Sequence, residues 1–191
     1  MFDYIRADIK YTFEQRKICS PASKLRFLLW GGQGLQATIV YRFGRWLERI
    51  RRHRFGWVIA IPLYPAYWVL SVCIHNLYDI HLEQSADIAS GFCIAHFGGI
   101  EVRNCRIGSH CYIYQNVKLG AKKTTGRGLV INEGVHISPH AEICADVTVG
   151  DGVTIGAGAV VTQDIPSRCL VLGNPGRIAQ CNYDNSGFLS P

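Results

Sequence analysis

A step of six residues governs the second half of the chain. From residue 131 to residue 161 an isoleucine or valine stands at every sixth position, and an apolar residue lies two positions before each. The key positions are Ile131, Ile137, Ile143, Val149, Ile155 and Val161. A period of six fits neither an α-helix, which repeats every ~3.6 residues, nor a strand, which repeats every ~2. It is typical of a parallel β-helix, in which stacked coils bury one continuous core.

The same step begins upstream and is interrupted twice. It is carried first by Ile88, Ile94 and Ile100 and then, one residue out of phase, by Ile107, Ile113 and Leu119. A longer break, at residues 121–128, is polar and basic. Solenoid proteins place binding contacts in loops that leave the repeat, so this loop is a candidate binding loop. A solvated loop without a function is the alternative.

The first eighty residues have the periodicity of helices. Apolar residues recur at helical spacing at Phe2, Ile5, Ile9 and Phe13. Ser20 and Pro21 are a typical N-cap and first-turn pair, and a second apolar stripe covers residues 35–50. The predicted fold class is therefore α+β, with an N-terminal helical domain followed by a β-helix.

Residues 55–74 contain no charged residue, and this uncharged segment is long enough to cross a bilayer. Pro62 and Pro65 are expected to bend a helix near its middle. Arginines cluster just before the segment, at Arg45, Arg49, Arg51, Arg52 and Arg54. Under the positive-inside rule, a single crossing would place the β-helix away from cytosolic cofactors. We therefore expect a bent helical pair in the membrane interface, with burial in an oligomer core or a true span as alternatives.

Composition narrows the partners and the compartment. The chain has 191 residues and a formal net charge of +6, which suits an anionic ligand or a membrane surface. No nucleic-acid motif surrounds the basic clusters, so no nucleic acid is expected. The 8 cysteines form no C-x-x-C pair, and without a secretory signal they favour the cytosol over a disulfide scaffold. His136 and His140 fall at different positions of the coil, and we predict no metal site.

Several motifs resemble those of hexapeptide-repeat acyltransferases, in particular the serine O-acetyltransferase branch. The matching segments of the β-helix are YDIH at 78–81, IAHFGGI at 94–100, YQNVKLG at 114–120, VVTQDIP at 160–166 and GNPGRI at 173–178. They resemble, in order, the family's D-I-H-P, I-D-H-x-x-G-I, Q-x-V-T-L-G, V-V-x-x-D-V-P and G-x-P-A-R-I. The opening IRADI at 5–9 resembles I-R-E-D-I, so the resemblance covers most of the chain.

This resemblance implies an architecture and a co-substrate. It implies a left-handed β-helix, a homotrimer, and acetyl-CoA bound in the groove between neighbouring prisms, with no permanently bound cofactor. We accordingly expect a helical domain for membrane association or trimerisation over 1–78, the β-helix acetyltransferase domain over 79–181, and a C-terminal tail over 182–191.

The resemblance also implies residue roles. His96 would be the general base that takes the proton of an acceptor hydroxyl, and Asp79 the carboxylate that orients it. Backbone N–H groups around Gly98, Gly99 or Gly120 are candidate oxyanion donors. Motif matching places acetyl-CoA against Gly120, Ala121, Lys122, Pro139, Ala157 and Arg177. The candidate acceptor-binding residues are Arg127, His81 and Gln115.

Two positions depart from the serine acetyltransferase pattern. Ala95 stands where those enzymes have an aspartate, and Gly128 stands where they have a second histidine. Because both residues serve the amino-acid acceptor, the chain is more similar to the acetyltransferases of capsule, exopolysaccharide and colanic-acid gene clusters. The expected function is acetyl transfer from acetyl-CoA to a sugar or lipid-linked sugar, at the cytoplasmic face of the inner membrane. Serine O-acetylation for cysteine biosynthesis and a non-catalytic membrane-associated scaffold are the alternatives.

Overall fold

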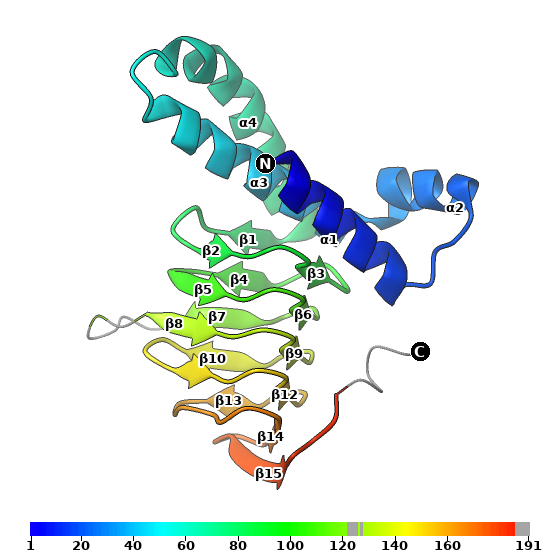
Figure 1. Ribbon diagram of the computed structural model, residues 1–191, viewed down its shortest axis with the longest axis vertical. Helices are drawn as coiled ribbons and strands as arrows, with labels where there is room; N and C mark the ends of the chain where they lie inside the picture. Colours follow the sequence, from blue (N-terminus) through cyan, green and yellow to red (C-terminus); the bar gives the residue numbers. More distant parts are fainter. Residues whose placement is uncertain (122–125, 127, 186–191) are drawn as a thin grey trace.

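The computed structural model describes residues 1–121, 126 and 128–185, and shows a stack of strands beneath a group of helices (Figure 1). The helical elements are α1 (Phe2–Gln15), α2 (Pro21–Arg26), the π-helical turn η1 (Phe27–Gly31), α3 (Gln33–Arg51) and α4 (Trp57–Tyr78). Strands follow from residue 80 to residue 181. This order confirms the predicted fold class, a helical N-terminal region followed by a left-handed parallel β-helix of hexapeptide repeats.

Within the described residues the strands form three sheets, one on each side of a prism. Sheet A contains β1 (Ile80–Leu82), β4 (Ile100–Val102), β7 (Lys118–Ala121), β10 (Glu142–Cys144) and β13 (Val160–Val161). Sheet B contains β2 (Asp87–Ile88), β5 (Cys105–Ile107), β8 (Leu129–Ile131) and β11 (Thr148–Val149). Sheet C contains β3 (Cys93–Ile94), β6 (Tyr112–Ile113), β9 (His136–Ile137), β12 (Thr154–Ile155), β14 (Cys169–Leu172) and β15 (Arg177–Cys181). Pairing is parallel except between β14 and β15.

The core of the prism consists of the inward side chains that the six-residue step predicted. Ile94, Ile113 and Ile137 lie in direct register on successive coils of sheet C, and each is buried. Fully burying one such side chain contributes about 1.5–3 kcal/mol. A single stack of aliphatic residues therefore holds the coils together.

The irregularities of the repeat all fall at one corner of the prism. From sheet B to sheet C, and from sheet C to sheet A, consecutive inward residues are always six apart. From sheet A to sheet B the pairs are Ile80 and Ile88, Ile100 and Ile107, Leu119 and Ile131, Ile143 and Val149, and Val161 and Ile165. Every difference in length between coils therefore falls at the A-to-B corner. At the C-to-A corner the coils stay in register down the prism.

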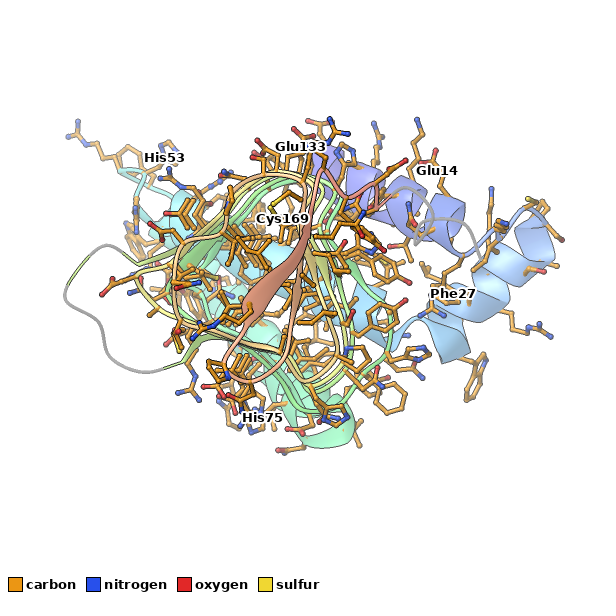
Figure 2. All side chains as sticks on the ribbon, turned by 90° about the horizontal axis from the view of Figure 1, so that it is seen from below. Glu14, Phe27, His53, His75, Glu133 and Cys169 are labelled. Carbon is orange, nitrogen blue, oxygen red and sulfur yellow. The ribbon has the colours of Figure 1, made fainter. Side chains whose placement is uncertain are left out.

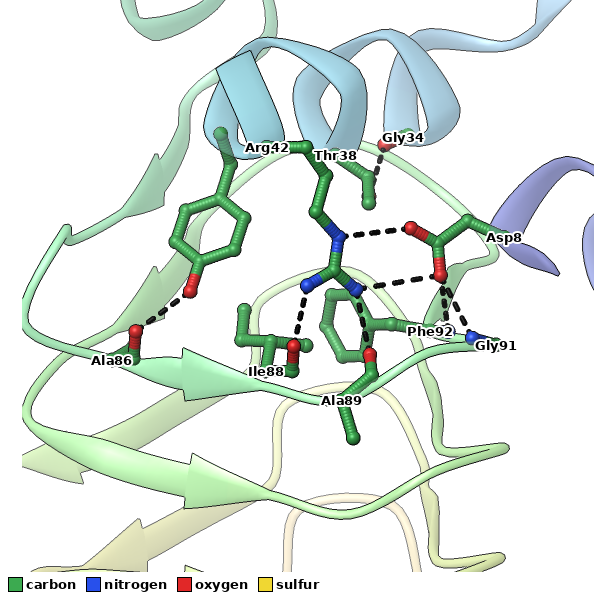
Figure 3. Close-up of polar contacts among 10 residues, drawn as sticks. Asp8, Gly34, Thr38, Arg42, Ala86, Ile88, Ala89, Gly91 and Phe92 are labelled. Carbon is green, nitrogen blue, oxygen red and sulfur yellow. Dashed lines mark hydrogen bonds and ion pairs between the residues drawn. The ribbon is translucent and has the colours of Figure 1, made fainter. Parts of the chain in front are cut away.

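A buried ion pair fastens the helices to the first coil (Figure 3). The Arg42 guanidinium of α3 donates to the Asp8 carboxylate of α1, with Nε 3.0 Å from Oδ2, and to the carbonyl oxygen of Ala89 at 2.6 Å. Asp8 Oδ1 also accepts the backbone N–H groups of Gly91, at 2.8 Å, and Phe92, at 3.1 Å. One charge pair thus joins α1, α3 and the turn before β3.

Helix α4 is continuous from Trp57 to Tyr78, so the bent pair expected from Pro62 and Pro65 does not form. Each proline removes one N–H donor, but α4 packs along α3 as an antiparallel hairpin (Figure 1), and the Tyr64 hydroxyl donates to Glu48 across it. In the described part of the chain, α4 is the one helix long and apolar enough to cross a membrane, and 6% of its apolar window is buried.

Candidate active site

The C-to-A corner carries one turn on each coil, and these turns lie above one another. They comprise residues 95–99, 114–117, 138–141 and 156–159. Backbone hydrogen bonds join them, from His140 N to Gln115 O at 3.1 Å and from Gly158 N to Pro139 O at 2.9 Å. Neighbouring coils lie about 4.8 Å apart, so the column is about 14 Å long. It contains four of the predicted site residues, His96, Gln115, Pro139 and Ala157.

Backbone contacts at both ends hold the turn that carries His96. The Ala95 N–H donates to the next coil at 2.8 Å, and the Arg16 guanidinium, which follows α1, donates to the Ala95 carbonyl. At the other end, the Gly98 carbonyl accepts the Asn116 N–H at 2.8 Å. His96 thus lies on a turn fixed to the coil below it and to the helical domain above it.

Glycine is required in this turn for two different reasons. Gly98 has a φ of +105° with open space where a Cβ would lie, so its requirement is purely conformational. Gly99 has a φ of +64°, and a Cβ there would lie 2.1 Å from the Asn116 side-chain oxygen. The G-G pair therefore sets both the path of the turn and its close approach to the second coil.

The His96 imidazole is exposed to solvent. Its ring lies 6.1 Å from the Tyr114 ring of the next coil, and the neighbouring Phe97 ring lies 5.9 Å from Tyr78 at the end of α4. An exposed imidazole on a held turn is accessible to a hydroxyl and a thioester that approach from outside the prism. This geometry suits a general base.

Asp79 lies beside this turn but binds other groups. It ends α4 in the left-handed conformation, with φ 51° and ψ 48°. Its carboxylate accepts the Gly99 N–H at 2.8 Å and lies 3.3 Å from His81 Nε2. Among the described residues no hydrogen bond joins Asp79 to His96. The expected orienting carboxylate, Asp79, therefore contacts His81 instead of His96. The same carboxylate also accepts the Gly99 N–H, which was a candidate oxyanion donor.

A cavity of about 310 Å³ adjoins His81, between the α3–α4 hairpin and the first coil. Its polar lining includes Tyr67, Ser71, His75, His81, Glu83, Gln84 and Arg103. The rings of His75 and His81 are 3.8 Å apart, and Figure 2 shows His75 on the side of the prism opposite Glu133. No sequence motif contains His75, because only the packing of α4 against β1 brings it to His81.

The predicted acetyl-CoA residues divide between two edges of sheet A. Pro139 and Ala157 lie in the column at the C-to-A corner, and Arg177 pairs with Leu172 near its lower end. Gly120 lies near the other end of β7, where a Cβ would meet the Arg103 carbonyl oxygen at 2.2 Å. Ala121 follows it and ends the strand. Lys122 and Arg127 lie outside the described residues.

Two further polar side chains lie close to the column. Gln115 is half-buried, and its Oε1 is a buried acceptor without a hydrogen-bond partner in the described part of the chain. His136 stacks on Tyr112, with ring centroids 5.2 Å apart, and burial lowers its pKa to about 4. No group of three potential metal ligands occurs among the described residues. Gln115 is thus the member of the predicted acceptor set that has an unused polar atom.

Comparison with known proteins identifies the family. Residues 128–163 match the protein family described as "Bacterial transferase hexapeptide (six repeats)". The serine acetyltransferase of Bacillus subtilis (strain 168) is 35% identical over 185 residues, which cover 95% of this chain and 78% of that protein. The chain belongs to the serine acetyltransferase family. The serine acetyltransferase of Synechococcus elongatus is 32% identical over 183 residues, which cover 93% of this chain and 68% of that protein.

Solved structures of serine acetyltransferases have the same architecture. The protein from Vibrio cholerae O1 biovar El Tor matches with a TM-score of 0.74 and 29% identity, over 98% of this chain and 69% of that chain. A structure described as a serine acetyltransferase complex with CoA matches with a TM-score of 0.73 and 27% identity, over 93% and 68% of the two chains. Both structures thus match this chain over its helical domain and its β-helix.

Two residues that distinguish this chain from serine acetyltransferases have definite surroundings. Ala95, directly before His96, is 4% exposed, so a methyl group packs where the family pattern has a carboxylate. Gly128 has a φ of +72°, and its N–H donates to Asp146 at 2.9 Å. A histidine at this position would carry a side chain in a conformation that favours glycine. Both departures are therefore accommodated by the local backbone and packing.

Proposed function

We propose that this chain acetylates a sugar hydroxyl, taking the acetyl group from acetyl-CoA with His96 as the general base. As a member of the serine acetyltransferase family, it is an acetyl-CoA-dependent O-acetyltransferase. Acetyl-CoA is its co-substrate and not a permanently bound cofactor. The acceptor is the part of the function that differs between the candidates considered below.

The chain's own residues suit a direct transfer. The acceptor oxygen attacks the thioester carbonyl carbon while His96 takes the hydroxyl proton. The tetrahedral intermediate then collapses, the C–S bond breaks, and the leaving thiolate takes the proton from the imidazolium. The products are an O-acetyl ester and CoA, so atoms and charge balance. The held turn contributes by fixing the backbone position from which the imidazole projects.

The observation that favours a sugar acceptor is the lack of ionisable side chains at Ala95 and Gly128, the two positions that depart from the serine acetyltransferase pattern. Serine has an ammonium and a carboxylate that a binding site must pair, and charged hydrogen bonds are the usual means. Ala95 and Gly128 have no ionisable side chain with which to pair them. A sugar has only neutral hydroxyls to satisfy. The cavity beside His81 has hydroxyl, imidazole, amide, carboxylate and guanidinium groups, all of which can hydrogen-bond to sugar hydroxyls, and lies within the usual size range of ligand pockets, about 300–1,000 Å³.

Free L-serine is the second candidate, and the comparisons favour it. The relatives and solved structures described above are named serine acetyltransferases. Under this alternative, residues other than Ala95 and Gly128 pair the charged groups of serine, and Gln115 has an unused acceptor for its ammonium.

We further propose that the active unit is a homotrimer. The predicted acetyl-CoA residues lie at two opposite edges of sheet A, with Pro139 at one and Gly120 at the other. In a groove between neighbouring prisms, the Pro139 edge of sheet A in one copy lies next to the Gly120 edge of sheet A in its neighbour. Both sets then contact a single acetyl-CoA, and a three-fold arrangement closes without an unused groove.

Release of CoA thiol from acetyl-CoA tests the acceptor directly. One set of reactions contains L-serine, and another contains the methyl glycosides of glucose, galactose, mannose and N-acetylglucosamine. The proposal predicts that a glycoside raises the rate above the acceptor-free rate while serine does not, and that mass spectrometry finds the acetyl ester on the glycoside. Turnover with serine alone would establish the second candidate in its place.

A further inference from the structure

The end of the α3–α4 hairpin exposes large apolar side chains far from the prism. We call residues 49–61 the hairpin tip; it lies at the end of the molecule remote from the β-helix (Figure 1). Phe55 is 71% exposed and Trp57 is 53% exposed. Val58, Ile59 and Ile61 are more than half exposed as well, whereas Ala60 is fully buried. One small residue thus packs the tip inward while five large apolar residues face outward.

The same tip has a strong positive charge. Arg49, Arg52 and Arg54 are exposed and form no ion pair within the described chain, whereas Arg51 pairs with Glu48 at 3.0 Å. Glu48 is the one acidic residue between positions 45 and 78 of the sequence. The Arg54 guanidinium lies 5.7 Å from the centre of the Phe55 ring. The hairpin tip therefore combines exposed apolar and exposed cationic side chains.

We propose that the hairpin tip and the exposed apolar residues Trp68, Val69 and Leu70 of α4 dock this protein onto an anionic lipid surface. Arginine and aromatic side chains are the pair that a membrane interface accommodates, because the rings enter the acyl boundary and the cations meet lipid phosphates. The cytoplasmic leaflet has the required negative surface potential. The protein is then peripheral on the cytoplasmic face of the inner membrane.

Charge argues against a two-fold contact as the occupant, and the three-fold contacts of the proposed homotrimer lie between prisms, from which the tip is remote (Figure 1). A two-fold contact through the tip would bring the same patch of both copies together. The unpaired arginines of one copy would then face those of the other with no carboxylate between them. An anionic lipid surface instead supplies the opposite charge.

The packing of α4 argues for a position in the interface instead of a span. Helix α3 runs antiparallel beside α4 and has Arg45 and Glu48 on its surface, and Tyr64 of α4 is bonded to Glu48. Charged groups at this depth are costly in the hydrocarbon core. Lying along the interface keeps them in the headgroup region.

This placement has a consequence that rests on the proposed function. Helix α4 ends at Tyr78, directly before Asp79, and Tyr78 contacts Phe97 beside His96. The proposed lipid-contacting helix therefore ends at the candidate active site. With α4 lying along the interface, the headgroup of a lipid-linked sugar can meet His96 at the far end of this helix.

Vesicle flotation of the full chain tests the docking independently of any turnover. Vesicles of phosphatidylcholine mixed with phosphatidylglycerol are compared with vesicles of pure phosphatidylcholine. We expect partition onto the mixed vesicles, weakened by high salt. The pair Arg52→Gln and Arg54→Gln should weaken it by about fivefold per arginine. The pair Phe55→Ser and Trp57→Ser should weaken it by about tenfold or more.

Matched substitutions on the prism serve as controls. Arg106→Gln removes an exposed arginine from β5, and Ile178→Ser removes an exposed isoleucine from β15, so both should leave partition unchanged. Absence of the wild-type protein from the mixed vesicles overturns the proposal, as does equal partition of the tip variants. Ultracentrifugation of the tip variants tests the rival occupant, a second copy of the chain. If the wild-type protein does not float with the vesicles and the tip variants break the oligomer apart, the surface is assigned to a second copy.

Discussion

The Asp8–Arg42 pair provides the strongest test of how the helical domain is attached, through the substitution Asp8→Asn. The Asp8 side chain is 1% exposed and that of Arg42 is 7% exposed. The carboxylate accepts four hydrogen bonds, two from Arg42 and one each from the N–H groups of Gly91 and Phe92. Asparagine has one acceptor oxygen and one donor amide. In either orientation of the amide, its NH₂ faces groups that themselves donate.

The expected cost follows from this burial. Breaking a buried ion pair by removing one partner costs about 3–5 kcal/mol, because the other charge stays buried without compensation. A typical domain has about 5–15 kcal/mol of stability in total, so the loss is a large fraction of it. The matched control is Asp87→Asn, because Asp87 pairs with Arg45 at 3.0 Å but its side chain is 61% exposed. Exposed pairs contribute about 0–1 kcal/mol.

Urea denaturation at one fixed protein concentration measures both variants. Fixing the concentration matters because the stability of an oligomer depends on it. We expect Asp8→Asn to lower the free energy of unfolding by about 3 kcal/mol or more relative to Asp87→Asn. A difference below about 1 kcal/mol would show that the clamp does not hold the helices on the first coil.

Two further predictions concern pH and the catalytic turn. Burial lowers the pKa of His136 to about 4 from 6.5, so the unfolded chain takes up the proton first and stability falls between about pH 6.5 and pH 4, by about 3 kcal/mol. His136→Gln should remove this dependence in urea titrations at several pH values, and an unchanged pH profile would contradict it. Gly99→Ala should lower kcat because its Cβ would meet Asn116 at 2.1 Å, whereas Gly134→Ala, at a similar φ of +65° with no atom within 4 Å, should not. Equal kcat values for the two variants would refute the close-approach argument.

The β-helix could be predicted from the sequence because its core repeats along one dimension. Each coil contributes one inward residue to each sheet, as Ile131, Ile137 and Ile143 do to sheets B, C and A, so the step of six residues indicates which residues are buried. The corner that holds the insertions was not predictable in the same way. It emerges only when residues are assigned to sheets, which shows that the break between Leu119 and Ile131 and the extra residue before Ile107 both fall between sheet A and sheet B.

The motifs name candidate site residues, but they do not predict how those residues pair. His96 was found from its motif, and the structure places it in a column with Gln115, Pro139 and Ala157. The contact of Asp79 with His81 depends on the left-handed end of α4, which no periodicity encodes. The same holds for Asp8 and Arg42, which are 34 residues apart and meet only through the packing of two helices. Pairings of this kind are tertiary, whereas the repeat is local.

The central claim is that His96 is the general base of an acetyl-CoA-dependent transfer. The most direct test is kcat for His96→Asn beside His140→Asn, measured with the acceptor that supports turnover. His140 lies on the same corner two coils below and is exposed like His96, so it is a matched control. We predict that His96→Asn lowers kcat by about a hundredfold to ten-thousandfold and that His140→Asn leaves it unchanged. A His96→Asn protein within about threefold of the wild-type kcat would contradict the account.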